Sequence, residues 1–82
     1  MILVLDNKVF INLYVLQLDK SFEVFLPINE KVGNILALLQ KNFFAENIRQ
    51  MILLNVQSGN IYNNNDLIRN TDIKNGTKLM II

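Results

Sequence analysis

The 82-residue chain contains no cysteine, no histidine and no tryptophan. The lack of cysteine excludes disulfides, thiolate nucleophiles and thiolate metal ligands. The lack of histidine removes the commonest general base near neutral pH. The chain must therefore be held together by its hydrophobic core, and we expect neither a metal nor a cofactor.

The chain also has few charged residues and almost no net charge. Charged residues make up 18% of the chain and the formal net charge is +1. A surface that binds nucleic acid needs clustered positive charge, so we expect no nucleic-acid partner. The eight basic residues are instead scattered along the chain: Lys8, Lys20, Lys31, Lys41, Arg49, Arg69, Lys74 and Lys78.

Long hydrophobic runs are missing as well. The apolar start of the chain, residues 1–5, is too short for a signal peptide and has no basic region before it. The run at residues 35–39 falls far short of the roughly 20 residues that a membrane span needs. We therefore expect a cytoplasmic protein without direct membrane insertion.

Hydrophobic residues nevertheless make up 51% of the chain, which favours a folded protein over a disordered one. The length predicts a single domain over residues 1–82. Residues 1–8 form an N-terminal extension to it. The apolar residues Ile2 to Leu5 are interpreted as an extra edge strand, and pairing with another chain is the alternative.

Apolar residues alternate in the first third of the chain, as in strands. The pattern predicts a strand over residues 9–18, a turn at Asp19 and Lys20, and a second strand over residues 21–26. Pro27 ends that strand because proline cannot donate a hydrogen bond to a ladder. This segment is predicted to be a β-hairpin.

The period then changes to that of a helix, predicted over residues 30–42 with Asn29 as its N-cap. Gly33 weakens the second turn by about 1 kcal/mol relative to alanine. A close approach between the helix and the sheet would explain this glycine. The apolar stripe consists of Val32, Ile35, Leu36, Leu39 and Phe43.

The second half of the chain alternates between strand patterns and turn residues. Residues 51–56 and 77–82 are predicted strands, Ile61 and Tyr62 a short strand, and residues 66–73 a packed irregular segment. Turns are predicted at residues 57–60, at the asparagine triplet 63–65 and at Asn75-Gly76. The order predicts an α+β fold whose last strand lies between the first and third strands, parallel to the first.

Two stretches carry a resemblance to a known family: Phe25-Leu26-Pro27-Ile28 before the helix at residues 32–39, and the apolar pattern of residues 66–82. In both, the chain resembles ubiquitin and, more closely, the YukD/EsaB family of small bacterial ubiquitin-like proteins. The resemblance covers roughly residues 9–82. It implies a ubiquitin-like β-grasp fold, with a mixed four- to five-stranded sheet and one helix across one face.

The same resemblance implies a function. YukD/EsaB proteins are cytoplasmic accessory or regulatory components of type VII secretion, the Gram-positive export pathway for WXG-type substrates. The partner would then be a component of a membrane secretion complex. A homodimer is an open alternative.

A ubiquitin-like modifier or β-grasp sulfur carrier is the alternative function. Such proteins need a flexible Gly-Gly tail that enters an activating enzyme. The chain ends inside a predicted strand, and Gly33, Gly59 and Gly76 are isolated. Its acidic residues lie in predicted turns, caps or exposed strand positions, so no acid–base pair is indicated. We therefore expect no enzyme and disfavour a modifier.

A domain without catalysis acts through its surface, and the resemblance to ubiquitin-like proteins implies an apolar patch on the face of the sheet opposite the helix. Leu79 and Ile81 take the core side of the last strand, so Met80 and Ile82 point outward. Leu53 on the neighbouring strand is predicted to share that face. The candidate partner-binding residues are Leu53, Met80 and Ile82.

Overall fold

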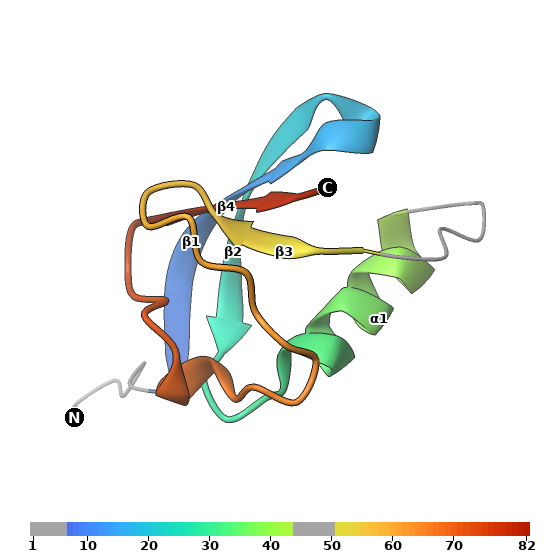
Figure 1. Cartoon of the computed structure of the whole chain (residues 1–82). Coiled ribbons are helices and arrows are strands. Elements are labelled where there is room, and N and C mark those ends of the chain that lie inside the picture. Colours follow the sequence, from blue (N-terminus) through green and yellow to red (C-terminus); the bar gives the residue numbers. More distant parts are fainter. Residues whose placement is uncertain (1–6, 44–50) are drawn as a thin grey trace, which may run out of the picture.

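The computed structural model describes residues 7–43 and 51–82. In this part of the chain one helix lies across a sheet of four strands, as Figure 1 shows. The α+β architecture predicted from the sequence is therefore confirmed. The elements, in order, are β1 (Lys8–Val15), the 3-10 helix η1 (Leu16–Leu18), β2 (Lys20–Pro27), α1 (Val32–Phe43), β3 (Leu53–Asn55), the 3-10 helix η2 (Ile68–Asn70) and β4 (Thr77–Ile81).

Strands β1 and β2 form the predicted hairpin, paired antiparallel from Lys8 opposite Pro27 to Val15 opposite Lys20. The prediction that the first strand continues to residue 18 is wrong. The chain leaves the ladder after Val15 and turns through η1. Asp19 then takes a left-handed conformation with φ of 49°, and its N–H donates to the Leu16 carbonyl at 3.2 Å.

The sheet order is β2-β1-β4-β3, with β4 parallel to β1 and antiparallel to β3. The last strand thus lies between the first and the third, as predicted. Its two neighbours place β4 in the centre of the sheet, where both of its sides are paired. A parallel neighbour requires a long crossover connection, and α1 forms part of it.

Helix α1 begins at Val32, and the assignment of Asn29 as its N-cap is wrong. Lys31 immediately precedes the helix, and its carbonyl accepts hydrogen bonds from the N–H groups of Asn34 and Ile35 at 3.1 and 3.2 Å. The Asn29 side chain instead accepts a hydrogen bond from the Arg69 guanidinium at 3.0 Å. It thereby links the turn before α1 to η2.

A loop from the second half of the chain caps the start of α1. The N–H of Val32 donates to the Asp66 carbonyl and that of Gly33 to the Asn64 carbonyl, both at 2.9 Å. The first N–H groups of a helix have no partner within the helix, so this loop satisfies two of them. The asparagine triplet forms the predicted turn, closed by the Asp66 N–H on the Asn63 carbonyl at 3.0 Å.

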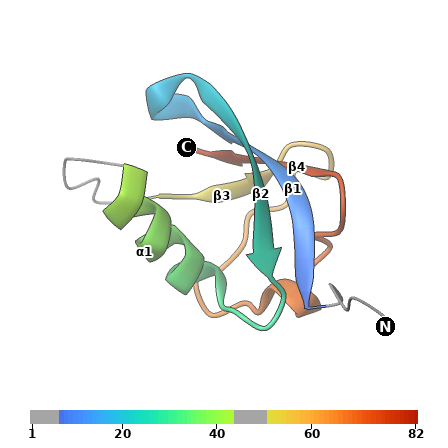
Figure 2. The ribbon, with the colours of Figure 1, turned by 180° about the vertical axis from the view of Figure 1, so that it is seen from behind.

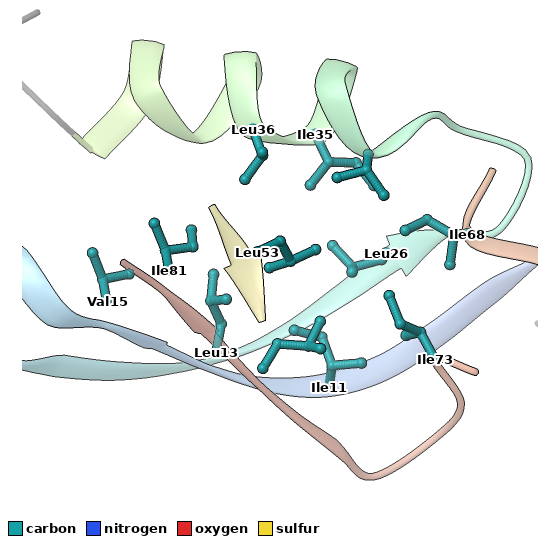
Figure 3. Close-up of a cluster of buried hydrophobic side chains, with 12 residues drawn as sticks. Ile11, Leu13, Val15, Leu26, Ile35, Leu36, Leu53, Ile68, Ile73 and Ile81 are labelled. Atoms are coloured by element: carbon teal, nitrogen blue, oxygen red, sulfur yellow. The ribbon is translucent and has the colours of Figure 1, made fainter. Parts of the chain in front are cut away.

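The core is one apolar layer between α1 and the sheet. Figure 3 shows Ile35 and Leu36 pointing from the helix toward Leu53 and Leu26. Ile68 and Ile73 close one end of the layer, which confirms that residues 66–73 form a packed irregular segment. The buried cluster consists of Ile11, Leu13, Val15, Leu26, Val32, Ile35, Leu36, Leu53, Ile68, Ile73, Leu79 and Ile81.

Three remaining predictions have different outcomes. The short strand at Ile61 and Tyr62 is reduced to a single bridge between Ile61 and Leu54. The turn at residues 74–77 is confirmed, with Gly76 at φ of 86°. The proposed edge strand at residues 2–5 lies outside the described residues.

Gly33 is required by the loop that caps the helix. A Cβ atom added at this position would lie 2.9 Å from the Asn64 Cβ and 3.1 Å from the Asn64 carbonyl oxygen. Both distances are shorter than ordinary van der Waals contacts. Gly33 does lie at a close approach, but the predicted approach of the helix to the sheet is wrong, because the helix meets the Asn64 loop here instead.

We expect Gly33→Ala to destabilise the fold by about 1–3 kcal/mol, although alanine favours an isolated helix by about 1 kcal/mol. The added methyl group would push Asn64 away and stretch the two capping hydrogen bonds. Urea unfolding measures the change. In an Asn64→Gly background, which removes the nearest atom, the same substitution should cost less. An equal or greater stability of Gly33→Ala would contradict the contact.

Candidate protein-interaction surface

A row of half-buried side chains crosses three strands on the side of the sheet opposite α1. Tyr14 of β1 is paired in register with Met80 of β4, and Met80 is paired with Leu54 of β3. Paired residues on neighbouring strands point to the same side of a sheet. We call Tyr14, Leu54 and Met80, together with the exposed Val56 that follows β3, the helix-free face.

The helix-free face is hollowed rather than flat. A depression of about 420 Å³ is lined by Tyr14, Val56 and Met80, and by the polar residues Asn12, Ser21 and Lys78. An apolar centre with a polar rim is the usual composition of a protein interface. Figure 2 gives the view of these strands from the side opposite to that of Figure 1.

Met80 and Ile82 lie where the sequence predicted them. Leu79 and Ile81 are buried in the core, whereas Met80 and Ile82 are half-buried. Ile82 also exchanges two backbone hydrogen bonds with Ile52, at 3.0 and 3.1 Å. Both predicted residues therefore lie on the outer side of the sheet.

The placement of Leu53 on this face is wrong. Leu53 is only 2% exposed and belongs to the core, and Leu54 takes the outward position. Residues 52–54 are all apolar, so the hydrophobic pattern does not fix which of them faces inward. Asn55, although polar, is 4% exposed and shares the inner side with Leu53.

Tyr14 and Val56 were missed by sequence reasoning. A signal for Tyr14 was present, because it alternates with Leu13 and Val15 on a strand predicted to lie beside the last one. The Tyr14 hydroxyl donates to the Asp19 carboxylate at 2.5 Å. That hydrogen bond, with a smaller effect of burial, raises the pKa of Tyr14, so this residue adds no charge to the face at neutral pH.

Asn55 is buried because the following turn is built on its side chain. Its Oδ1 accepts from the N–H groups of Gln57 at 2.9 Å and Ser58 at 3.2 Å. Its Nδ2 donates to the Tyr62 hydroxyl oxygen at 3.1 Å. A buried amide with these partners carries little desolvation penalty.

Asp72 lies beside this amide and accepts hydrogen bonds from the Tyr62 hydroxyl and from Asn60 Nδ2, the latter at 2.9 Å. The Tyr62 bond lowers the pKa of Asp72. Burial, with the bond to Asp72 as the second cause, raises the pKa of Tyr62 to about 12. Asp72 is thus a hydrogen-bond acceptor that stays ionised at neutral pH, and the cluster ties residues 57–62 to the segment before β4.

Residues 7–43 and 51–82 contain no group of three acidic side chains placed to hold a metal ion. In the same part of the chain, no helix has the length and apolar character needed to cross a membrane.

Neither a family model nor a curated protein matches the chain. Solved structures do. The N-terminal ubiquitin-like domain of the 4931431F19Rik protein matches with a TM-score of 0.73 and 18% identity, over 93% of this chain and 74% of that one. The fold is ubiquitin-like. It is a β-grasp with a four-stranded mixed sheet and one helix, as the resemblance implied.

Two further matches extend the comparison. A structure on molecular mimicry of SUMO in DNA repair aligns with a TM-score of 0.76 and 10% identity, over 93% of this chain and 91% of that one. A chain of the MycP5-free ESX-5 inner membrane complex aligns with a TM-score of 0.72 and 16% identity, over 93% of this chain but 21% of that one. At such identities these likenesses show the fold alone.

The Tyr62–Asp72 pair predicts a loss of stability at high pH. The pKa of Tyr62 is about 12 in the folded protein and 10.0 ordinarily. The contribution of Tyr62 to the free energy of unfolding is therefore complete below pH 10 and is lost as the pH rises toward 12. We expect a loss of about 1 kcal/mol after allowing for solvent screening. Chemical denaturation between pH 8 and 12 measures it.

Tyr62→Phe serves as the control because it removes the hydroxyl and keeps the ring. This variant should be less stable than the parent at pH 8, and the difference should shrink toward pH 12. If the difference is independent of pH, the hydroxyl does not stabilise the loop through Asp72.

Proposed function

We propose that this protein is a non-catalytic, ubiquitin-like protein-interaction module that acts as a cytoplasmic accessory or regulatory component of a bacterial type VII secretion system. The observation that carries the interaction role is the row of Tyr14, Met80 and Leu54 across the helix-free face. Side chains on the solvent side of such a sheet are usually polar, and this row is not.

The chemistry of the helix-free face supports a protein partner. Its centre is apolar and uncharged, and methionine adapts its shape to different contacts. Lys78 and Asn12, which are paired in register, supply polar groups at the rim. A partner that covered this face would remove apolar surface from water, which is the main driving force of association.

The assignment to type VII secretion is supported by two separate likenesses. The residues before the helix and the pattern of residues 66–82 resemble the YukD/EsaB family. The ESX-5 inner membrane complex contains a chain with a domain of this fold. A small domain of the same shape outside the bilayer could contact a complex of that kind, and the helix-free face is our candidate for the contact.

Deletion of the coding sequence in the native host, followed by complementation, tests the proposal. We expect deletion to change the amount of WXG-type substrate in the culture medium and the parent gene to restore it. Met80→Asp should fail to restore it. At least about tenfold less of this variant than of the parent protein should bind to purified secretion complex. The new carboxylate would be desolvated at the interface without a partner.

Leu16→Asp is the matched control. Leu16 is 52% exposed and lies in η1, outside the helix-free face, so this variant should behave as the parent. Circular dichroism must show that both variants fold. Unchanged export after deletion, or full function of a folded Met80→Asp variant, would contradict the proposal. A covalent adduct on the native protein would favour the modifier alternative.

A further inference from the structure

The turn before β4 contains the only asparagine of the chain that is followed by glycine, Asn75-Gly76. In such a pair the glycine backbone nitrogen, once it has lost its proton, can attack Cγ of the asparagine side chain. The new bond closes a five-membered succinimide ring, and the side-chain nitrogen leaves as ammonia with the proton that the glycine lost. Water then opens the ring to aspartate or isoaspartate. Glycine favours the attack because it has no side chain to shield its nitrogen.

In the folded protein both reacting groups are held by one residue of β1. Asn75 Oδ1 accepts from the Phe10 N–H, and the Gly76 N–H donates to the Phe10 carbonyl, both at 2.8 Å. The next pair along is Ile11 opposite Thr77, where the β1–β4 ladder begins. The Asn75 side chain therefore extends that ladder by one step, with its amide oxygen in place of a backbone carbonyl.

These two hydrogen bonds oppose the reaction at both of its partners. The Gly76 N–H must leave the Phe10 carbonyl before it can lose its proton, because a hydrogen bond made by the neutral form disfavours ionisation. The Asn75 side chain, held by its Oδ1, is not free to rotate its Cγ toward the Gly76 nitrogen. Ring closure thus requires that the turn first separate from β1.

Two more hydrogen bonds close the turn itself. The Thr77 N–H donates to the Lys74 carbonyl at 3.0 Å, and the Lys74 N–H donates to Thr77 Oγ1 at 2.9 Å. Thr77 is buried, whereas Asn75 and Gly76 are exposed. Water reaches the reactive pair, so the pair is protected by these hydrogen bonds rather than by burial.

We propose that Asn75 is a site of spontaneous deamidation that the fold controls. The reaction is suppressed while Phe10 holds Asn75 and Gly76, and it proceeds when this end of the β1–β4 ladder opens. Such local openings cost less free energy than unfolding of the whole chain. The aspartate product keeps an acceptor for the Phe10 N–H. The isoaspartate product adds one carbon to the main chain and displaces Gly76 from Phe10, so it weakens the start of β4.

Peptide mass spectrometry tests the proposal, which does not depend on the function of the helix-free face. The full chain is incubated at pH 8, once folded and once unfolded in guanidinium chloride, and conversion of Asn75 is followed with time. We expect conversion to be at least about tenfold slower in the folded protein. A synthetic peptide of residues 72–79 corrects for any effect of the denaturant itself. Asn75→Gln is the control, because its longer side chain must close a six-membered ring and should react slowly in both states.

Hydrogen exchange identifies the opening that controls the rate. The Gly76 N–H must be released from the Phe10 carbonyl both for exchange with solvent and for ring closure. Guanidinium chloride below the unfolding transition should therefore accelerate the two processes in parallel. General rigidity of the chain would not link the deamidation rate to this one amide.

Two matched variants test the role of the turn. Thr77→Val keeps the buried volume and removes the oxygen that accepts from Lys74, so it should accelerate both deamidation of Asn75 and exchange of Gly76 by about threefold or more. Thr71→Val removes the hydroxyl of a half-buried threonine before the turn and should change both rates less than about twofold. Circular dichroism must show that both variants fold.

Several results would overturn the proposal. Equal rates in the folded and unfolded protein would show that the Phe10 bonds do not suppress the reaction. A faster rate in the folded protein would show that the Phe10 N–H activates the Asn75 amide instead. An unfolded chain that stays unconverted would remove the site. Conversion of Asn75 while the Gly76 amide resists exchange would show that no opening is required.

Discussion

The fold depends on one apolar layer between a single helix and a four-stranded sheet. Helix α1 has 12 residues and can cover only one side of the sheet. The twelve buried side chains come from both, with Ile68 and Ile73 closing one end. Within residues 7–43 and 51–82, no further layer covers the other side of the sheet or the outer edge of β2. The helix-free face follows from this limit.

The end of this layer is fixed by polar contacts rather than by further apolar packing. The capping bonds from Val32 and Gly33 hold the asparagine loop against the helix. The cluster of Asn55, Tyr62 and Asp72 holds the next turn against the sheet. In so small a domain there is little apolar surface to bury, so irregular segments are positioned by specific hydrogen bonds. Substitutions at these positions should therefore disturb the loops more than they disturb the sheet.

The repeating patterns in the sequence predicted most of the fold, because alternation and helical spacing report which side of an element is buried. They were sufficient for the hairpin, for α1 and for β4 in the centre of the sheet. They failed for Leu53, since the unbroken apolar run of residues 51–54 carries no alternation. Its neighbour Asn55 is buried only because Tyr62 and the turn at Gln57 and Ser58 satisfy its side chain. Such long-range partners leave no local signal.

The asparagine amides do in this domain what further strands and helices do in a larger one. An amide accepts and donates at the same time, so it can pair with backbone groups that no neighbouring strand reaches. Asn55 builds the turn after β3 in this way, and Asn75 extends the β1–β4 ladder by one step. The two positions differ in their chemistry because Asn75 is followed by glycine. Its amide is protected only while it is bonded, so at this end of the sheet the folding of the chain and its chemical integrity depend on the same hydrogen bonds.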